Sequence, residues 1–224
     1  MPIPSLSGIQ KRIEFACARV GRKPSEVTLI GASKMVLAER LVEFQAAGLH
    51  TFGENYIQEG IQKVDFFREQ GLAANWHCIG ALQSNKAREA VAHFDVIHSV
   101  DRFSLAKELD KEARKIGKMQ QVLLQVNVGA EASKAGVSPE ELPELWHKVA
   151  GLENLSIQGL MSLPPFQENA EDSRVYHRTL RSLLEASSLP AGQLSMGMSH
   201  DFEIAIEEGA TLIRVGTALF GARS

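Results

Sequence analysis

The sequence predicts an α/β protein, specifically a (β/α)8 (TIM) barrel with an extra N-terminal helix. Most of the eight short apolar runs are near-continuous, which is typical of parallel strands that are buried on both faces. Amphipathic stretches with helical spacing separate these runs. A strand–helix unit therefore recurs about every two to three dozen residues, and eight such units favour a closed barrel.

The first element is a helix, expected over residues 7–20. Ser7 and Gln10 form a capping-box pattern, and the apolar residues that follow have helical spacing. This helix precedes the first strand, so it lies outside the repeating units.

The strands and helices then alternate. The predicted strands span residues 27–33, 50–53, 76–80, 94–99, 122–128, 155–161, 193–198 and 211–216. The predicted helices span residues 37–47, 55–69, 85–93, 102–116, 139–149, 170–186 and 201–208. The second and fourth strands are short, and losing either would weaken the barrel prediction. The main alternative is an open doubly wound sheet, but no Gly-x-Gly-x-x-Gly turn follows the first strand.

Composition limits the class of protein. The 224 residues are 44% hydrophobic, which suits one domain over residues 1–224 with a sizeable core. The net charge of −3 gives no basic excess for nucleic acid or an anionic membrane. The N-terminus lacks the apolar stretch of a signal peptide, and no apolar run approaches the roughly 18 residues of a membrane span. We therefore expect a soluble, cytoplasmic protein.

The side chains of cysteine and histidine give no metal site. Cys17 and Cys78 are far apart in unlike contexts, so both are expected to be buried, reduced thiols. The seven histidines lack His-Glu-x-x-His or similar ligand spacing. His77 is interpreted as a core histidine, and no Gly-x-Ser-x-Gly elbow supports a Ser-His-Asp triad.

Lys34 lies at the end of the first strand, where a barrel places its functional residues. An amine in that position can attack an aldehyde and form a Schiff base. The alternative is a lysine whose side chain extends from the rim into solvent.

Two glycine-containing segments follow the last two strands. Residues 195–199 read SMGMS and residues 214–217 read RVGT, so Ser199, Gly216 and Thr217 lie at strand ends. Glycine lets backbone N–H groups approach a phosphate, and barrels often bind phosphate after strands seven and eight. We therefore expect a phosphate site there, against the alternative of an N-cap and a simple turn.

Arg214 and Asn55 complete the candidate site. Arg214 shares a strand face with Leu212 and Gly216, and if that face looks into the barrel, the guanidinium points at the mouth. The alternative is an ion pair with a carboxylate such as Glu54. Asn55 follows the second strand, where it could hydrogen-bond a ligand ring or cap the next helix.

Several motifs together resemble the pyridoxal phosphate homeostasis protein family, which has a fold-type III pyridoxal-phosphate-binding barrel. The matching stretches are ASK at 32–34, FGENYIQEG at 52–60, WHCIGALQSNK at 76–86, GLMSLPP at 159–165 and the segment 195–223. The resemblance spans nearly the whole chain. It implies that pyridoxal 5′-phosphate (PLP) is the cofactor, bound as a Schiff base on Lys34.

The resemblance also implies roles for the other residues. Ser199, Gly216 and Thr217 match phosphate-binding positions, Arg214 matches the arginine that faces the pyridine nitrogen, and Asn55 matches a residue that lines the pocket. Two positions depart from the family pattern. Val36 replaces a second lysine found in many relatives, and Ala81 replaces a common proline.

The resemblance favours a carrier over an enzyme. Alanine racemases join a similar barrel to a second domain that supplies a tyrosine acid/base, whereas this chain ends shortly after the eighth strand. Neither Tyr56 nor Tyr176 has an obvious place in that role. We expect an intracellular PLP homeostasis protein without substantial turnover, a monomer whose recipients are PLP-dependent apo-enzymes. The alternatives are a weak amino-acid racemase and a Schiff-base aldolase or phosphosugar isomerase.

Overall fold

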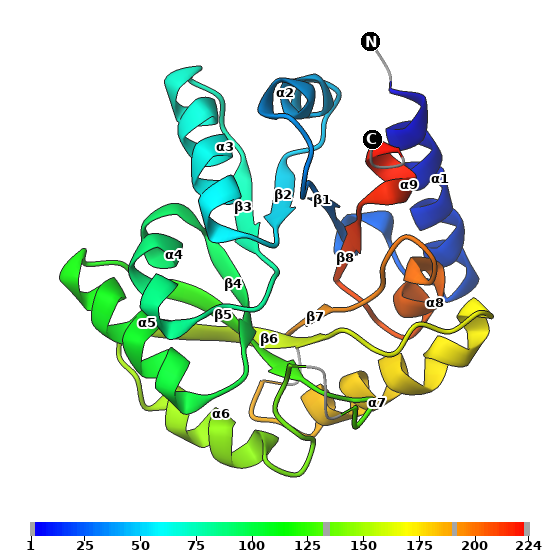
Figure 1. The fold of residues 1–224 in the computed structure, drawn as a ribbon. Helices are drawn as coiled ribbons and strands as arrows, with labels where there is room; N and C mark the ends of the chain where they lie inside the picture. The colour runs from blue at the N-terminus through cyan, green and yellow to red at the C-terminus, as the bar shows by residue number, and fades with distance from the viewer. Residues whose placement is uncertain (1–2, 132–134, 190–191, 222–224) are drawn as a thin grey trace.

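Eight parallel strands close into one barrel in the computed structural model, which describes residues 3–131, 135–189 and 192–221 (Figure 1). Each strand pairs with the next in chain order, and the last pairs with the first. The strands are β1 Thr28–Ala32, β2 Thr51–Glu54, β3 Asn75–Cys78, β4 Val96–Val100, β5 Gln120–Val126, β6 Leu155–Ser162, β7 Gln193–Ser195 and β8 Leu212–Val215. The predicted barrel is confirmed, including the short second and fourth strands.

Helices surround the barrel (Figure 1). The α-helices are α1 Pro4–Arg19, α2 Ala38–Ala46, α3 Ile57–Glu69, α4 Ala87–His93, α5 Phe103–Lys115, α6 Leu142–Ala150, α7 Arg174–Glu185, α8 Phe202–Glu207 and α9 Thr217–Phe220. The described residues also form the 3₁₀ turns η1 Pro24–Glu26, η2 Ser84–Lys86 and η3 Ala170–Ser173. Each predicted helix is present, although the predicted ranges 85–93 and 170–186 each begin with a 3₁₀ turn.

The N-terminal helix begins earlier than the capping-box pattern predicts. The backbone N–H of Ser7 donates to the carbonyl of Ile3, so Ser7 lies inside α1 and does not cap it. Pro4 occupies the first helical position, where its missing N–H costs no hydrogen bond. The prediction that Ser7 and Gln10 start the helix is therefore wrong.

The extra helix α1 packs beside α8 and α9, next to the last strand (Figure 1). Ser5 Oγ donates to the carbonyl oxygen of Leu219 at 2.7 Å. Arg12 forms an ion pair with Glu203 at 2.6 Å and stacks over the ring of Phe202. These contacts connect the two ends of the described chain.

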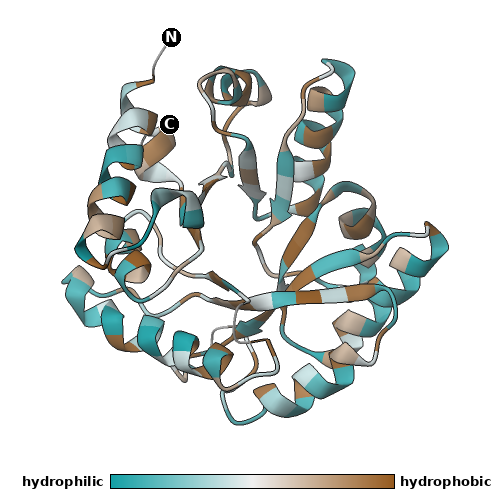
Figure 2. Cartoon of the chain, turned by 180° about the vertical axis from the view of Figure 1, so that it is seen from behind, coloured by the Kyte–Doolittle hydropathy of each residue, from teal (hydrophilic) through white to brown (hydrophobic). Residues whose placement is uncertain are grey.

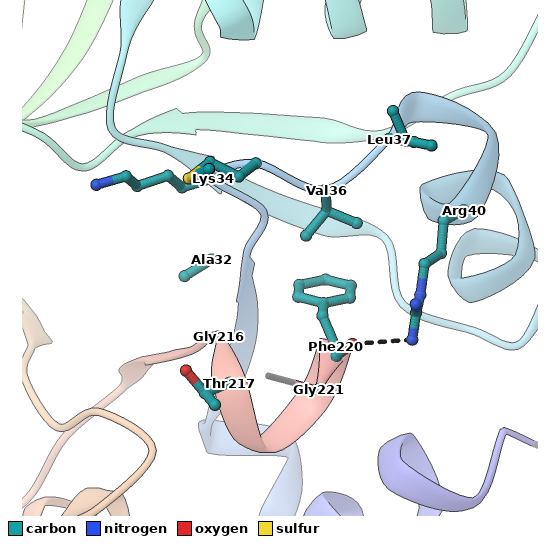
Figure 3. Close-up of a pocket in the computed structure, with 10 residues that line it drawn as sticks. Ala32, Lys34, Val36, Leu37, Arg40, Gly216, Thr217, Phe220 and Gly221 are labelled. Atoms are coloured by element: carbon teal, nitrogen blue, oxygen red, sulfur yellow. Dashed lines mark hydrogen bonds between the residues drawn. The ribbon is translucent and has the colours of Figure 1, made fainter. Parts of the chain in front are cut away.

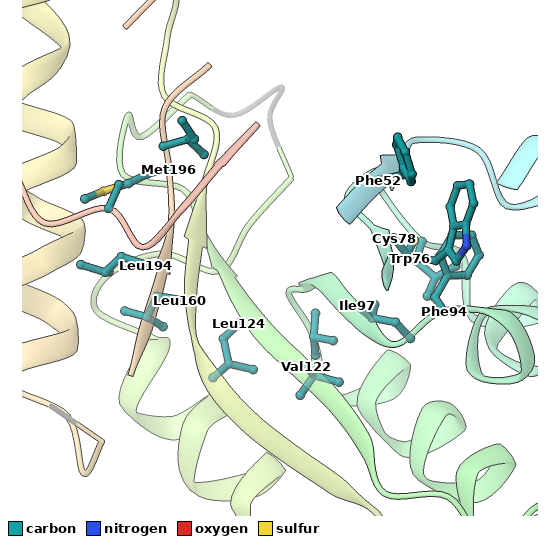
Figure 4. Close-up of a cluster of buried hydrophobic side chains, with 14 of the residues drawn as sticks. Phe52, Trp76, Cys78, Phe94, Ile97, Val122, Leu124, Leu160, Leu194 and Met196 are labelled. Atoms are coloured by element: carbon teal, nitrogen blue, oxygen red, sulfur yellow. The ribbon is translucent and has the colours of Figure 1, made fainter. Parts of the chain in front are cut away.

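The hydrophobic core has two parts. The larger part lies between the strands and the helices, where Phe52 and Trp76 have ring centroids 5.3 Å apart (Figure 4). The helices show alternating hydrophilic and hydrophobic residues, as expected when one face packs on a sheet (Figure 2). A smaller cluster comes from the opposite face of the strands and lies inside the barrel, and it comprises Ile30, Val96, Leu123, Met161 and Leu212.

Strand β7 ends three residues before the end predicted for it. Gly197 has φ of +89°, in the left-handed region that favours glycine, so the chain turns away from the barrel there. A Cβ at residue 197 would lie only 2.5 Å from the Cβ of Ala205. The close approach of this turn to α8 therefore also requires glycine.

The two cysteines are buried, as the sequence predicts. Cys17 lies on α1 and Cys78 on β3, and both pack in the larger core. Burial raises the pKa of Cys78 to about 12, so this thiol stays protonated and is a poor nucleophile.

Within the described ranges, no helix combines the length and apolar character needed to cross a bilayer.

Candidate functional site

Three of the predicted site residues line one cavity at the C-terminal ends of β1 and β8. Lys34, Gly216 and Thr217 surround a space of about 180 Å³, together with Val36 and Arg40 (Figure 3). Lys34 comes two residues after β1, and Gly216 comes directly after β8. The pairing of these strands therefore brings together residues that are far apart in the sequence.

The Lys34 side chain is half-buried and points away from Arg40, across the end of β1 (Figure 3). Its Nζ lies 4.8 Å from the ring centroid of Tyr56, a cation–π contact. No carboxylate of the described residues forms an ion pair with this amine. Tyr56 belongs to the FGENYIQEG stretch, and the sequence analysis assigns this tyrosine no role in the site.

The loop that carries Lys34 is fixed by Lys63, a residue of α3 that the sequence analysis missed. The buried Lys63 Nζ donates to the carbonyl oxygen of Ser33, to Glu54 Oε1 and to Glu59 Oε1, each at 2.7 Å. Glu59 Oε1 in turn accepts the backbone N–H of Met35. Lys63 thus holds both neighbours of Lys34, Ser33 directly and Met35 through Glu59.

The backbone conformation next to Lys34 is unusual. Met35 has φ of +63°, which residues other than glycine rarely adopt. The bond from its N–H to Glu59 helps to hold this conformation. Such conformations persist where surrounding contacts enforce them, and they often occur at functional sites.

Glu54 is not the partner of Arg214. It is fully buried and bonded to Lys63 and to Ser33 Oγ. Burial raises the pKa of Glu54, while Lys63 opposes the shift. The alternative of an Arg214–Glu54 ion pair is therefore wrong.

Ser199 lies against the start of α9. Its Oγ accepts the backbone N–H groups of Gly216 at 3.3 Å and Ala218 at 3.5 Å. Gly216 also packs closely on β1, since a Cβ there would lie 3.3 Å from the carbonyl oxygen of Ala32. The structure thus joins Ser199 and Gly216 around N–H groups that attract anions.

The loop that carries Ser199 is anchored by Asp201. Its Oδ1 accepts the backbone N–H of Met198 at 2.8 Å, and its Oδ2 pairs with Nε2 of the buried His177 at 2.9 Å. Burial raises the pKa of Asp201, but the hydrogen bonds from His177 and Met198 outweigh it and hold the pKa below its ordinary value. Asp201 therefore stays ionised and stabilises the turn between β7 and α8.

Arg214 points into the barrel, as the strand alternation predicts. Leu212 belongs to the inner cluster, whereas Ile213 and Val215 pack in the outer core. Arg214 Nη1 donates to Ser195 Oγ, and Nη2 donates to the carbonyl oxygen of Ser162 at 2.7 Å. Burial lowers the pKa of Arg214 to about 10, so the side chain remains a cation at neutral pH.

Asn55 follows β2 directly and is half-buried at the same rim. Its backbone packs on Gly80, where a Cβ would lie 2.2 Å from the Asn55 carbonyl oxygen. The next residue, Tyr56, contacts Lys34. The other three predicted residues do not line the cavity of Figure 3, namely Asn55, Ser199 and Arg214.

Sequence comparisons identify related proteins over almost the whole chain. A pyridoxal phosphate homeostasis protein of Aquifex aeolicus is 46% identical over 222 residues, covering 97% of this chain and 96% of the relative. The protein of that name from Pseudomonas aeruginosa is 46% identical over 220 residues, covering 98% and 94%. The segment 195–223, which the sequence analysis matches to this family, ends with two residues that lie outside the described ranges.

Structural comparisons agree with this relationship. PipY of Synechococcus elongatus, solved with PLP bound, has a TM-score of 0.81 and 39% identity, covering 95% of this chain and 100% of that chain. An alanine racemase of Clostridium difficile has a TM-score of 0.70 at 14% identity and covers 95% of this chain and 56% of that chain, which shows a shared fold alone. The family model for the alanine racemase N-terminal domain matches residues 6–224. The chain therefore belongs to the pyridoxal phosphate homeostasis protein family, built on the alanine racemase N-terminal fold.

Proposed function

We propose that this protein binds PLP as a Schiff base on Lys34 and stores or delivers it, without substantial turnover. The observation that carries the proposal is the shared cavity of about 180 Å³, which Lys34 lines together with the residues that start α9. An aldehyde and a phosphate on one small molecule need this combination of an amine and anion-binding N–H groups.

The residues of this site fit the chemistry of PLP. Lys34 Nζ contacts an aromatic ring rather than a carboxylate, so the amine is available to an aldehyde. The N–H groups of Gly216 and Ala218 converge on Ser199 Oγ, and Thr217 adds a hydroxyl at the same place. The names of the relatives and the PLP bound to PipY support the same assignment.

Arg214 supports a carrier rather than an enzyme. Bound PLP supplies an aldehyde for capture and a ring that accepts electrons best when its nitrogen is protonated. We assign Arg214 to the ring nitrogen, and its positive charge disfavours a second charge beside it. Asn55 is assigned to the rim of the pocket. We further propose that the recipients are PLP-dependent apo-enzymes.

The test is to reconstitute the protein with PLP, record the visible spectrum, reduce with borohydride and map the modified peptide. We expect a visible Schiff-base band and a modification at Lys34. Lys34→Ala should lose both. Lys86→Ala removes another half-buried lysine, one that pairs with Glu89, and should retain both. A wild-type protein that gains no band with PLP would overturn the proposal.

The second candidate is a weak amino-acid racemase, which the contact between Tyr56 and Lys34 favours. In this contact Lys34 faces the aromatic ring. The carrier proposal, in contrast, predicts no solvent deuterium at the α-carbon of alanine or serine after prolonged incubation with the loaded protein. Deuterium incorporation that is lost in both Lys34→Ala and Tyr56→Phe would instead establish the racemase.

A further inference from the structure

A continuous chain of polar side chains crosses the inside of the barrel beneath the candidate site. His77 Nδ1 lies 2.8 Å from His98 Nε2, and His98 Nδ1 lies 2.9 Å from Ser195 Oγ. Ser195 Oγ also accepts from Arg214 Nη1. The chain thus connects β3, β4, β7 and β8, and all four side chains are buried.

The hydrogens in this chain have one satisfied arrangement. Arginine can only donate, so Ser195 Oγ accepts from Arg214 and has a single hydrogen to give. That hydrogen goes to His98 Nδ1, and His98 Nε2–H then donates to His77 Nδ1. If His98 instead carried its hydrogen on Nδ1, both His98 and Arg214 would donate to Ser195 Oγ. The hydroxyl hydrogen of Ser195 would then have no acceptor among the residues that the structure describes.

The electrostatics of the chain agree with this arrangement. Burial lowers the pKa of His77 to about 4. Burial, followed by the charges of His77 and Arg214, holds the pKa of His98 well below its ordinary value. Asp201 is the carboxylate whose charge acts on Arg214. Both imidazoles are therefore neutral at physiological pH, and Arg214 is the cation of the group.

We propose that His77 and His98 are positioning residues that act through Ser195 to orient the Arg214 guanidinium toward the cofactor pocket. A neutral His98 accepts the hydrogen of Ser195 and so fixes the hydroxyl as an acceptor for Arg214, whereas a protonated His98 would leave that hydrogen without its acceptor. The effect on PLP rests on the proposed function, but the hydrogen-bond direction is a property of the protein alone.

The direction of the hydrogen bond between Ser195 and His98 can be measured in the wild-type protein without PLP. Long-range ¹H–¹⁵N spectra of ¹⁵N-histidine-labelled protein distinguish the two neutral tautomers and the imidazolium. We expect His77 and His98 to be neutral Nε2–H tautomers throughout pH 5.5 to 8, a window that includes the ordinary histidine pKa of about 6.5. An Nδ1–H tautomer at His98, or titration of His98 within this window, would overturn the assignment.

The effect on the cofactor is tested with His98→Gln and Ser195→Ala, each reconstituted with PLP. We expect about tenfold weaker PLP binding and a changed pH profile of the visible band, because Ser195→Ala removes a partner of Arg214 and His98→Gln removes the imidazole that orients the Ser195 hydroxyl. His93→Gln replaces a half-buried histidine of α4 and should match the wild type. Wild-type affinity and pH profile in a folded variant would overturn the positioning role. Failure of the wild type to bind PLP would overturn the proposed function and leave the tautomer result standing.

Discussion

Lys63 shows how one side chain can determine the geometry of a neighbouring loop. It is nearly fully buried and reaches a backbone carbonyl and two carboxylates at the same distance. Its substitution removes three hydrogen bonds and leaves the buried Glu54 with the Ser33 hydroxyl as a donor but without a cationic partner. The Lys34 loop depends on this contact through Ser33 and through Met35.

We predict that Lys63→Met lowers the free energy of unfolding by about 3–5 kcal/mol, the usual cost of removing one partner of a buried ion pair. Urea denaturation measures the loss. The control is the double variant Lys63→Met/Glu54→Gln, which removes the uncompensated charge and should regain part of the stability. A single variant as stable as the wild type would contradict this assignment of Lys63.

Single residues also show what the sequence can reveal. The alternation in LIRVG predicts that Arg214 shares a strand face with Leu212, and the structure shows that this face looks into the barrel. Lys63 gives no such signal. In the sequence it is one charged residue of an amphipathic helix, and its role depends on contacts with β1 and β2 that only the closed barrel creates.

At the scale of elements, the turn between β7 and α8 carries Ser199 and is held by a carboxylate. Asp201 joins the backbone of Met198 to the imidazole of His177 on α7. The anchor links α7 to the turn that precedes α8 and does not itself line the cavity of Figure 3. Its loss should therefore affect stability first and ligand binding through Ser199.

We predict that Asp201→Asn destabilises the protein by about 1–3 kcal/mol at neutral pH, because the charged acceptor is lost. The wild-type pKa is lowered by folding, so this stability is present above the unfolded-state pKa of about 4 and disappears as the pH falls through the folded-state pKa. Unfolding curves from pH 7 to pH 3 should converge for the two proteins. A difference that is constant over this range would contradict the role of the ionised carboxylate.

Element boundaries are less predictable than the elements themselves. The apolar runs locate all eight strands, yet β7 ends early because Gly197 turns the chain toward α8. The helix α1 starts before the capping-box pattern at Ser7, since proline at the first turn provides another helix start. In both cases a nearby residue shifts the boundary: Gly197 ends the strand within its apolar run, and Pro4 starts the helix before Ser7.

For the whole molecule, we predict a monomer. Large exposed apolar side chains are distributed over separate elements, among them Phe15 on α1 and Val175 on α7. Stable dimers generally bury a continuous and largely apolar patch. Sedimentation velocity should give the mass of one chain at micromolar concentration, with and without PLP. A dimer that persists on dilution would contradict this expectation.

The inner apolar cluster has a consequence for how a ligand enters and leaves the barrel. Its side chains Val96 and Leu212 lie two residues before His98 and Arg214 on the same strand faces, on the side away from the candidate site. Among the described residues, this apolar cluster therefore fills the barrel below its polar layer, and we expect a bound molecule to enter and leave at the C-terminal ends of the strands. An amine that displaces the bound molecule must then approach from the same side of the barrel. Substitutions at the rim should consequently change the rates of ligand binding and of ligand release together.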